Sequence, residues 1–307
     1  MIAALLVLTG WVLTILPGTY HRAARLESRR WARSAAASLG VGLLSVEVGL
    51  VALAAPAALR ALRIPAIAGV CDHLVGPFTL GGYFGAVTAG MVATIVALRV
   101  GHAARRTYRS TLATVVEPWL GRHEDKGDFD LVVLPTDQLL AMSVPGVRGQ
   151  VVISEGLIDS LSPEQLDVVI EHEATHQRNR HWRYTMLASV VEHAFAPFRG
   201  PARSADALRT SLEAWADDGA AGESAHRRAV VRRAIFLITR SCSATASAIP
   251  DALHERVARL HAPPHSLALG TRVWILLPMA ALALMSGVLT SGALLGVHHA
   301  AVLDRFC

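Results

Sequence analysis

Hydrophobic residues gather in four long runs along this chain, and polar, arginine-rich stretches separate them. The runs cover residues 2–20, 35–59, 78–98 and 274–297. Each is close to the roughly 20 residues that a helix needs to cross the hydrocarbon core of a bilayer. The pattern therefore predicts four transmembrane helices. Buried helices of a large soluble protein are the alternative, which the placement of arginine on alternate sides of the runs disfavours.

The arginine residues indicate how these helices are oriented. Five arginines lie between residues 22 and 33, after the first run, and four lie between residues 99 and 109, after the third. An excess of positive charge in short loops is typical of the cytoplasmic side. We therefore predict a multi-pass protein of the cell membrane, with both stretches in the cytoplasm and with the N- and C-termini on the extracytoplasmic side.

Between the third and fourth runs, the chain has the mixed pattern of a folded domain outside the bilayer. Short apolar or alternating segments predict strands at 130–134, 139–144 and 150–154. Helical periodicity then predicts a helix that begins after Ser162, further helices over 183–196, 225–240 and 252–261, and a break at 197–201.

The predicted fold class is a mostly α membrane protein that carries a small α+β domain between its third and fourth spans. Three spans fall within residues 1–100 and the cytoplasmic domain within 101–270. Residues 271–307 supply the fourth span and a short extracytoplasmic tail.

The helix after Ser162 carries the strongest chemical signal. Ser162 and Gln165 have the spacing of a capping box, which marks the helix start. His172 and His176 are four residues apart, so their imidazoles share one face and can reach one metal ion. Glu173 lies beside them, where a carboxylate can take a proton from water. This His-Glu-x-x-His arrangement is typical of zinc peptidases.

A third ligand is needed, because catalytic zinc sites have three protein ligands and one open position. Glu213 and Asp217 share a face of a second predicted helix. We predict that Glu213 completes the site for one Zn²⁺ and that Asp217 holds a ligand imidazole from outside. The alternative is that Glu213 and Asp217 lie on a solvent-exposed helix face and bind no metal. His181 and His193 are further potential ligands, although no partner lies at ligand spacing from His193.

Composition narrows the class of protein. Hydrophobic residues make up 52% of the 307 residues and charged residues only 17%, and the mean hydropathy is +0.41. These values exclude an ordinary soluble domain. The net charge of +5 suggests nucleic acid at first sight. The arginines flank apolar runs, however, so we expect contact with membrane lipid and no direct binding of nucleic acid.

Single residues within and beside the spans leave alternatives open. Glu47 lies in the middle of the second run, where a carboxyl group either has a function or finds a partner on a neighbouring span. Cys71 and Cys307 are both predicted outside the cytoplasm, where they either form a disulfide or remain two free thiols. Cys242 is predicted in the cytoplasm and should stay reduced.

The chain resembles the BlaR/MecR family of membrane-embedded zinc metallopeptidases, in the clan of the HtpX and CAAX-prenyl proteases. The most specific part is residues 151–176, which resemble the family's strand, Gly-Leu turn and metal helix. Residues 140–146 resemble the clan's edge-strand region, residues 213–217 its third-ligand motif, and Arg256-Val257 is also similar. The resemblance implies a zincin-like domain between the spans.

Two departures from the family pattern bear on function. The clan often has Asp five residues after the second metal histidine, where this chain has His181. The family's sensor proteins carry a penicillin-binding domain after the fourth span, whereas here the predicted tail is short. We therefore expect no direct sensing of β-lactams.

The function predicted from these features is a membrane-bound zinc-dependent endopeptidase. The resemblance suggests a cytoplasmic regulatory protein as substrate, such as a winged-helix transcriptional repressor. We expect the substrate to lie along the edge strand at 139–144. The alternatives are an HtpX-like protease for quality control of membrane proteins, and a non-catalytic signalling receptor with a structural zinc site. A fourth protein ligand from His181 or His193 would favour the receptor. The oligomeric state is not predicted.

Overall fold

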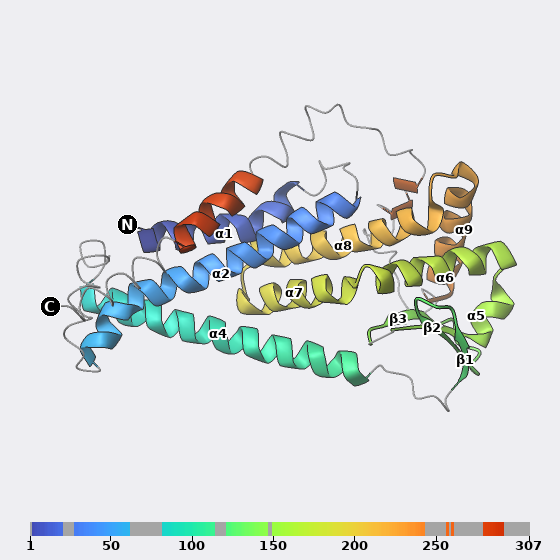
Figure 1. The fold of residues 1–307 in the computed structure, drawn as a ribbon, viewed down its shortest axis with the longest axis horizontal. Coiled ribbons are helices and arrows are strands. Elements are labelled where there is room, and N and C mark those ends of the chain that lie inside the picture. The colour runs from blue at the N-terminus through green and yellow to red at the C-terminus, as the bar shows by residue number, and fades with distance from the viewer. Residues whose placement is uncertain are drawn as a thin grey trace.

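The computed structural model describes a mostly helical chain with one small sheet at one end (Figure 1). The described residues are 2–20, 28–61, 82–113, 121–146, 149–242, 256–257, 259–260 and 279–291. The connection around Cys71 and the tail to Cys307 lie outside these residues, so whether the two cysteines form a disulfide is not tested.

Three helices are long and apolar enough to cross a membrane: α1 (Ile2–Tyr20), α2 (Ser28–Ala61) and α4 (Gly82–Ala113). They correspond to the first three predicted spans and pack with α2 between the other two. Within the fourth predicted span, the structure describes the shorter apolar helix Met279–Ser291. The rest of that run lies outside the described residues, so the fourth span stays a prediction.

Two of these helices extend beyond the apolar runs that predicted them. The helix α2 begins at Ser28 rather than at residue 35, and α4 continues to Ala113 rather than ending at residue 98. The added segments are rich in alanine and arginine, which favour helix. Charged residues end a hydrophobic run without ending the helix, so the predicted boundary near residue 100 falls inside a continuous element.

Glycines allow α1 and α2 to approach closely. A Cβ added to Gly42 would lie 2.8 Å from the carbonyl oxygen of Gly10, and one added to Gly10 would lie 2.6 Å from the carbonyl oxygen of Gly42. Backbones at this separation exclude any side chain between them, as in other membrane helix pairs with small residues at the crossing.

The sheet contains four described strands in the order β1-β2-β4-β3. They are β1 (Arg122–Asp125), β2 (Asp130–Leu134), β3 (Ala141–Val144) and β4 (Gln150–Ser154). The central strands β2 and β4 are parallel, and β1 and β3 pair with them antiparallel, one at each edge. The strand β1 was not predicted, because its four residues are all polar and exposed. The predicted strand 139–144 begins at Ala141, two residues later than expected.

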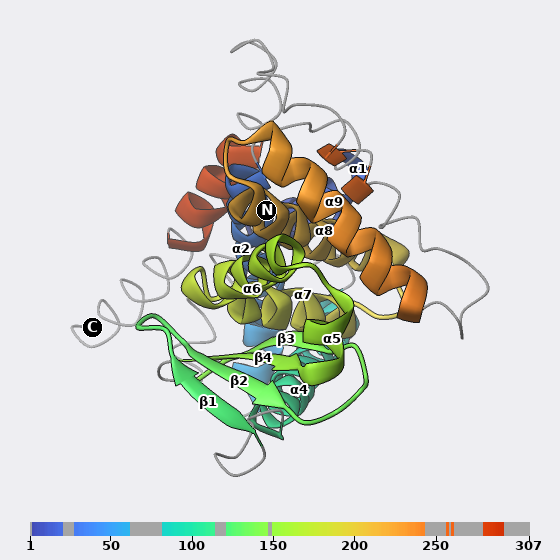
Figure 2. The ribbon, with the colours of Figure 1, turned by 90° about the vertical axis from the view of Figure 1, so that its right-hand side faces the viewer.

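Five helices follow the sheet in the chain; two of them run alongside the candidate membrane helices, and the others lie at the end of the molecule that carries the sheet (Figures 1 and 2). They are α5 (Glu155–Ser160), α6 (Pro163–Arg178), α7 (His181–Ala194), α8 (Arg199–Ala221) and α9 (Ala225–Cys242). The helix α6 packs on β3 and β4, whereas α7 and α8 form a pair beside α1, α2 and α4. The break predicted at 197–201 is shorter than expected, since α8 already begins at Arg199.

The turn between α7 and α8 packs against α1, the first of the candidate membrane helices. The ring of Trp11 in α1 packs edge-on against Phe195 and Phe198, with centroid distances of 5.6 Å and 5.0 Å. Farther along the same helix, the Gly18 N–H donates to Ser204 Oγ over 2.9 Å. Because α8 carries Glu213, these contacts connect the candidate membrane helices to the helix of the predicted third ligand.

Replacing Gly42 by alanine should destabilise the fold. The new methyl group meets backbone, which cannot rotate away, so we expect a loss of about 1–3 kcal/mol in the free energy of unfolding. Thermal unfolding of the full chain in detergent measures the effect. Gly101→Ala on α4 is the matched control, because a Cβ there meets nothing within 4 Å. Equal melting temperatures for the two variants would contradict the close α1–α2 packing.

Candidate metal centre

The start of α6 has the capping box that its sequence predicts. Ser162 Oγ accepts from the Gln165 N–H over 3.3 Å, and Gln165 Oε1 accepts from the Ser162 N–H over 2.9 Å. Val168 and Val169 are buried and orient the helix on the sheet. The capping box fixes where α6 begins and the buried valines fix its rotation about its axis, so His172 and His176 face α8.

The helix α8 comes very close to α6. A Cβ on Gly219 would lie 2.5 Å from Thr175 Oγ1, so α8 can approach α6 only because residue 219 has no side chain. The apolar residues of α8 that recur at helical spacing are buried: Leu208, Leu212 and Trp215. The result is that α8 presents Glu213 to the two histidines of α6.

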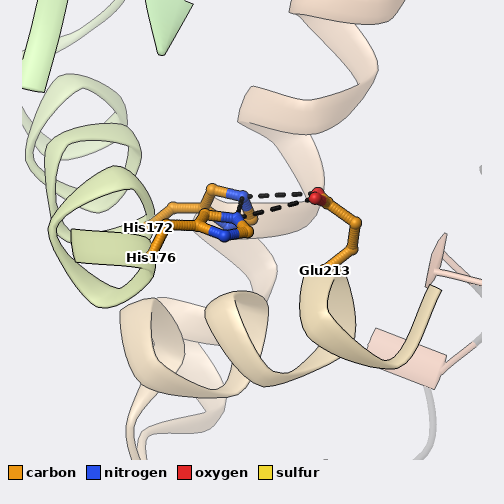
Figure 3. A group of neighbouring side chains, drawn as sticks. All are labelled: His172, His176 and Glu213. Carbon is orange, nitrogen blue, oxygen red and sulfur yellow. Dashed lines mark hydrogen bonds and ion pairs between the residues drawn. The ribbon is translucent and has the colours of Figure 1, made fainter. Parts of the chain in front are cut away.

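His172, His176 and Glu213 converge as predicted (Figure 3). Glu213 Oε2 lies 3.5 Å from His172 Nε2, and Glu213 Oε1 lies 3.6 Å from His176 Nε2. The two Nε2 atoms are 3.2 Å apart. One ligand atom from each residue lies within 4.8 Å of the others. Two imidazole nitrogens and one carboxylate oxygen, aimed at a common point, fit a Zn²⁺ ion.

Each histidine has a hydrogen-bond partner on its outer nitrogen. Asp217, which is 2% exposed, places Oδ1 3.1 Å from His172 Nδ1. This is the position predicted for it. His181 places its own Nδ1 2.8 Å from His176 Nδ1. Both partners leave Nε2 directed toward Glu213, as the outer partners of metal-binding histidines generally do.

Neither extra histidine joins the ligand group. His181 contacts the outer nitrogen of His176, and His193 Nδ1 donates to the Ser189 carbonyl oxygen of its own helix over 2.7 Å. Within the part of the chain that the structure describes, the cluster contains three potential ligands. An open fourth position is the pattern of catalytic rather than structural zinc sites.

Arg256 also belongs to the site, although in the sequence only a family resemblance points to it. Its guanidinium group donates to both oxygens of Asp217 over 2.7 Å and 2.9 Å. It also lies 3.1 Å from Glu213 Oε2. One cation thus holds both predicted carboxylates of α8 in place.

The carboxylates and Arg256 set the charge of the site. Burial acts to lower the pKa of His172, but its hydrogen bonds with Asp217 and Glu213 outweigh burial and raise it to about 10. Burial lowers the pKa of His176 to about 4, against the opposing effect of Glu213. Burial also acts to raise the pKa of Glu213, but His172 and Arg256 hold it at about 2.

Glu173 lies on the same helix, next to the first histidine. Burial raises its pKa, and the backbone N–H of Ser143 in β3 donates to its carboxylate. A raised pKa brings a carboxylate closer to the range in which it can both accept and return a proton. The arrangement therefore combines a metal-binding group with a base beside it.

Zinc binding should release a proton from His172. In protein stripped of metal, His172 is protonated below its pKa of about 10, whereas a ligand imidazole must be neutral. Raising the pH toward 10 should therefore strengthen apparent zinc binding by about tenfold per pH unit. Competition with a chelator of known affinity, from pH 7 to 9, measures this slope. In the Asp217→Asn variant, the increase of zinc affinity with pH should end at a lower pH. Zinc affinity that does not change with pH in the unaltered protein would contradict the assignment of His172 as a ligand.

Comparison with known families places part of the chain. The model of peptidase family M48 matches residues 108–262, a segment that contains all the site residues named above. Comparison with curated proteins gives no match, and comparison with solved structures gives none either. Because the matched segment covers half of the chain and carries the site, the chain belongs to peptidase family M48.

Proposed function

We propose that this protein is a membrane-bound zinc-dependent endopeptidase in which His172, His176 and Glu213 hold the metal and Glu173 is the general base. The convergence of the three ligand groups beside Glu173 is the observation that carries the proposal. Membership of a family of metallopeptidases, together with three helices of membrane-spanning length, supports it.

Each residue has a distinct role in this mechanism. When bound, Zn²⁺ supplies a Lewis acid that lowers the pKa of water and polarises a carbonyl group. Glu173 accepts the proton of the attacking water and passes it to the nitrogen of the leaving amine. Asp217 and His181 keep the two imidazoles in orientation. Arg256 offsets part of the negative charge of the two carboxylates of α8 and holds them in place.

The edge strand β3 offers a place for an extended substrate. In the antiparallel β3–β4 pair, the Ser154 N–H donates to the Leu140 carbonyl oxygen over 3.1 Å. Hydrogen-bonded pairs alternate along such a ladder. The backbone groups of Ala141 and Ser143 therefore point away from β4, toward the outer edge. A peptide that pairs with this edge would run past Glu173, which already contacts Ser143.

Gln177 ties this edge strand to the metal helix. Its Nε2 donates to the carbonyl oxygens of Val144 and Gln150, over 2.6 Å and 2.9 Å. Gly149, with φ of +74°, makes room for the same amide, since a Cβ there would lie 2.4 Å from Gln177 Oε1. Gln177 directly follows the ligand His176, so the strand and the metal site are held in one frame.

For the substrate, we propose a cytoplasmic regulatory protein such as a winged-helix transcriptional repressor, following the BlaR/MecR resemblance. One observation favours the second candidate, an HtpX-like protease that removes damaged membrane proteins. Ser28, the first residue of α2, hydrogen-bonds Asp218, next to Asp217 of the site. The site therefore lies close to the level at which a candidate span ends, within reach of segments that emerge from the bilayer.

Replacing Glu173 by glutamine should leave zinc bound and abolish cleavage. The three ligands remain and only the base is lost, so we expect one zinc ion per chain and a loss of about 100-fold or more in the cleavage rate. Metal analysis and a peptidase assay on the same preparation measure both. Glu171→Gln is the control, because Glu171 pairs with Arg178 away from the metal group and such partly exposed pairs contribute little. Unchanged cleavage would remove Glu173 from the mechanism.

The same inactive variant distinguishes the two substrate classes. The Glu173→Gln variant should bind its substrate without cleaving it. It can therefore be crosslinked to its partners in native membranes, and the partners can be identified by mass spectrometry. Soluble DNA-binding proteins among the partners would support the regulator. Membrane proteins, enriched after heat or oxidative stress, would support quality control.

Topology can be tested separately from the chemistry. From the arginine distribution, we expect reporter fusions after Arg33 and Arg106 to be active in the cytoplasm. Fusions after Pro65 and Cys307 should be active on the other side of the membrane. The reverse pattern would place the metal site outside the cytoplasm and exclude a cytoplasmic repressor as substrate.

A further inference from the structure

A row of aromatic contacts leads from the metal ligand His176 to the helix that carries Glu213. The rings of His176 and His181 are edge to face, with centroids 4.7 Å apart. The ring of His181 in turn lies 4.6 Å, between centroids, from the indole ring of Trp215. One buried imidazole thus contacts both the ligand and a tryptophan that lies two residues after Glu213.

The His181 ring has a nitrogen with an unusual environment. The residue is 2% exposed, and its Nε2 has no hydrogen-bond partner among the described residues. An imidazole that accepts a hydrogen bond from His176 at Nδ1 must carry its own hydrogen on Nε2. Buried polar groups without partners are uncommon in native proteins, so their position needs an explanation other than stability. Here the opposite nitrogen fixes the orientation of a metal ligand.

Two arginines of α2 hold the tryptophan in place. The guanidinium carbons of Arg29 and Arg33 lie 5.6 Å and 5.5 Å from the centre of the Trp215 ring, within the range of cation–π contacts. Three residues farther along α8, Asp218 Oδ2 accepts a hydrogen bond from Ser28 Oγ over 2.5 Å. The start of α2 is therefore attached to α8 at two points, on either side of Asp217.

We propose that the first two turns of α2 position the metal ligand His176, with Trp215 and His181 as the connecting side chains. Arg29 and Arg33 hold the indole ring, the indole ring supports His181, and His181 fixes the direction of His176 Nε2. These are positioning residues, since none of them belongs to the ligand group. The inference rests on the metal site of the proposed function. The helix α2 is long and apolar enough to cross a membrane. The proposed connection therefore makes the zinc affinity depend on where α2 lies.

Metal affinity in the full chain, purified in lipid nanodiscs, tests the proposal. The decisive variant is the double substitution Arg29→Gln with Arg33→Gln, because both side chains are exposed and their loss should not unfold the protein. We expect zinc affinity, measured by competition with a chelator, to fall about threefold or more. His181→Phe should lower it about 10- to 100-fold, as the loss of an outer hydrogen-bond partner does at other metal sites.

Three further measurements separate positioning from general damage. Arg29→Lys with Arg33→Lys keeps the cations over the indole ring and should restore most of the affinity. Arg106→Gln, an exposed arginine of α4, removes a similar charge elsewhere and should change nothing. In protein loaded with Co²⁺, the visible absorption bands of the glutamine variant should shift, because the orientation of one ligand has changed.

The outcomes are distinguishable. Unchanged affinity and spectrum in the double glutamine variant would overturn the proposal, even if His181→Phe weakens binding. A loss that lysine does not restore would also overturn it, because the cation–π contact would then not be responsible. Failure of the unaltered protein to bind zinc at all would instead reject the metal site on which the proposal rests.

Discussion

The close contact between α6 and α8 determines whether this chain can form a metal centre. The imidazoles come from one helix and the carboxylate from the other, so the donor atoms converge only at a short separation between the helices. The bare backbone at Gly219, against Thr175, allows that separation. Arg256 then offsets the repulsion between the two carboxylates that the contact brings together. The edge strand β3 is tied to the same helix α6 by Gln177.

Local patterns were sufficient to predict much of the fold and the donor set. The capping box at Ser162, the four-residue spacing of His172 and His176, and the apolar stripe ending at Trp215 are all short-range signals. They fix where a helix starts and which face it buries. The length of each apolar run also predicted the first three apolar helices, because that length can be read directly from the sequence.

Other features depend on contacts that no local pattern contains. Arg256 meets Asp217 across 39 residues of chain, and the sequence pointed to this arginine only through a family resemblance. His181 is five residues from His176, a spacing that does not share a helix face. It reaches the ligand because the chain turns at Arg180, whose φ is +51°, and begins a new helix. The strand β1 forms only by pairing with β2, since its own residues are polar and exposed.

The fastening of the α7–α8 turn to Trp11 also bears on which polypeptides the site can reach. With Phe195 and Phe198 packed on α1 and α8 continuing from there to Glu213, a single helix fixes the level of the ligand group along the candidate spans. That level is close to the start of α2, since Ser28 hydrogen-bonds Asp218. A scissile bond in a membrane-anchored chain would therefore reach the site only near that same level, close to the end of its own anchor. A bond at another level would be out of range unless a flexible segment carried it there, so selection by distance would operate before selection by side chain.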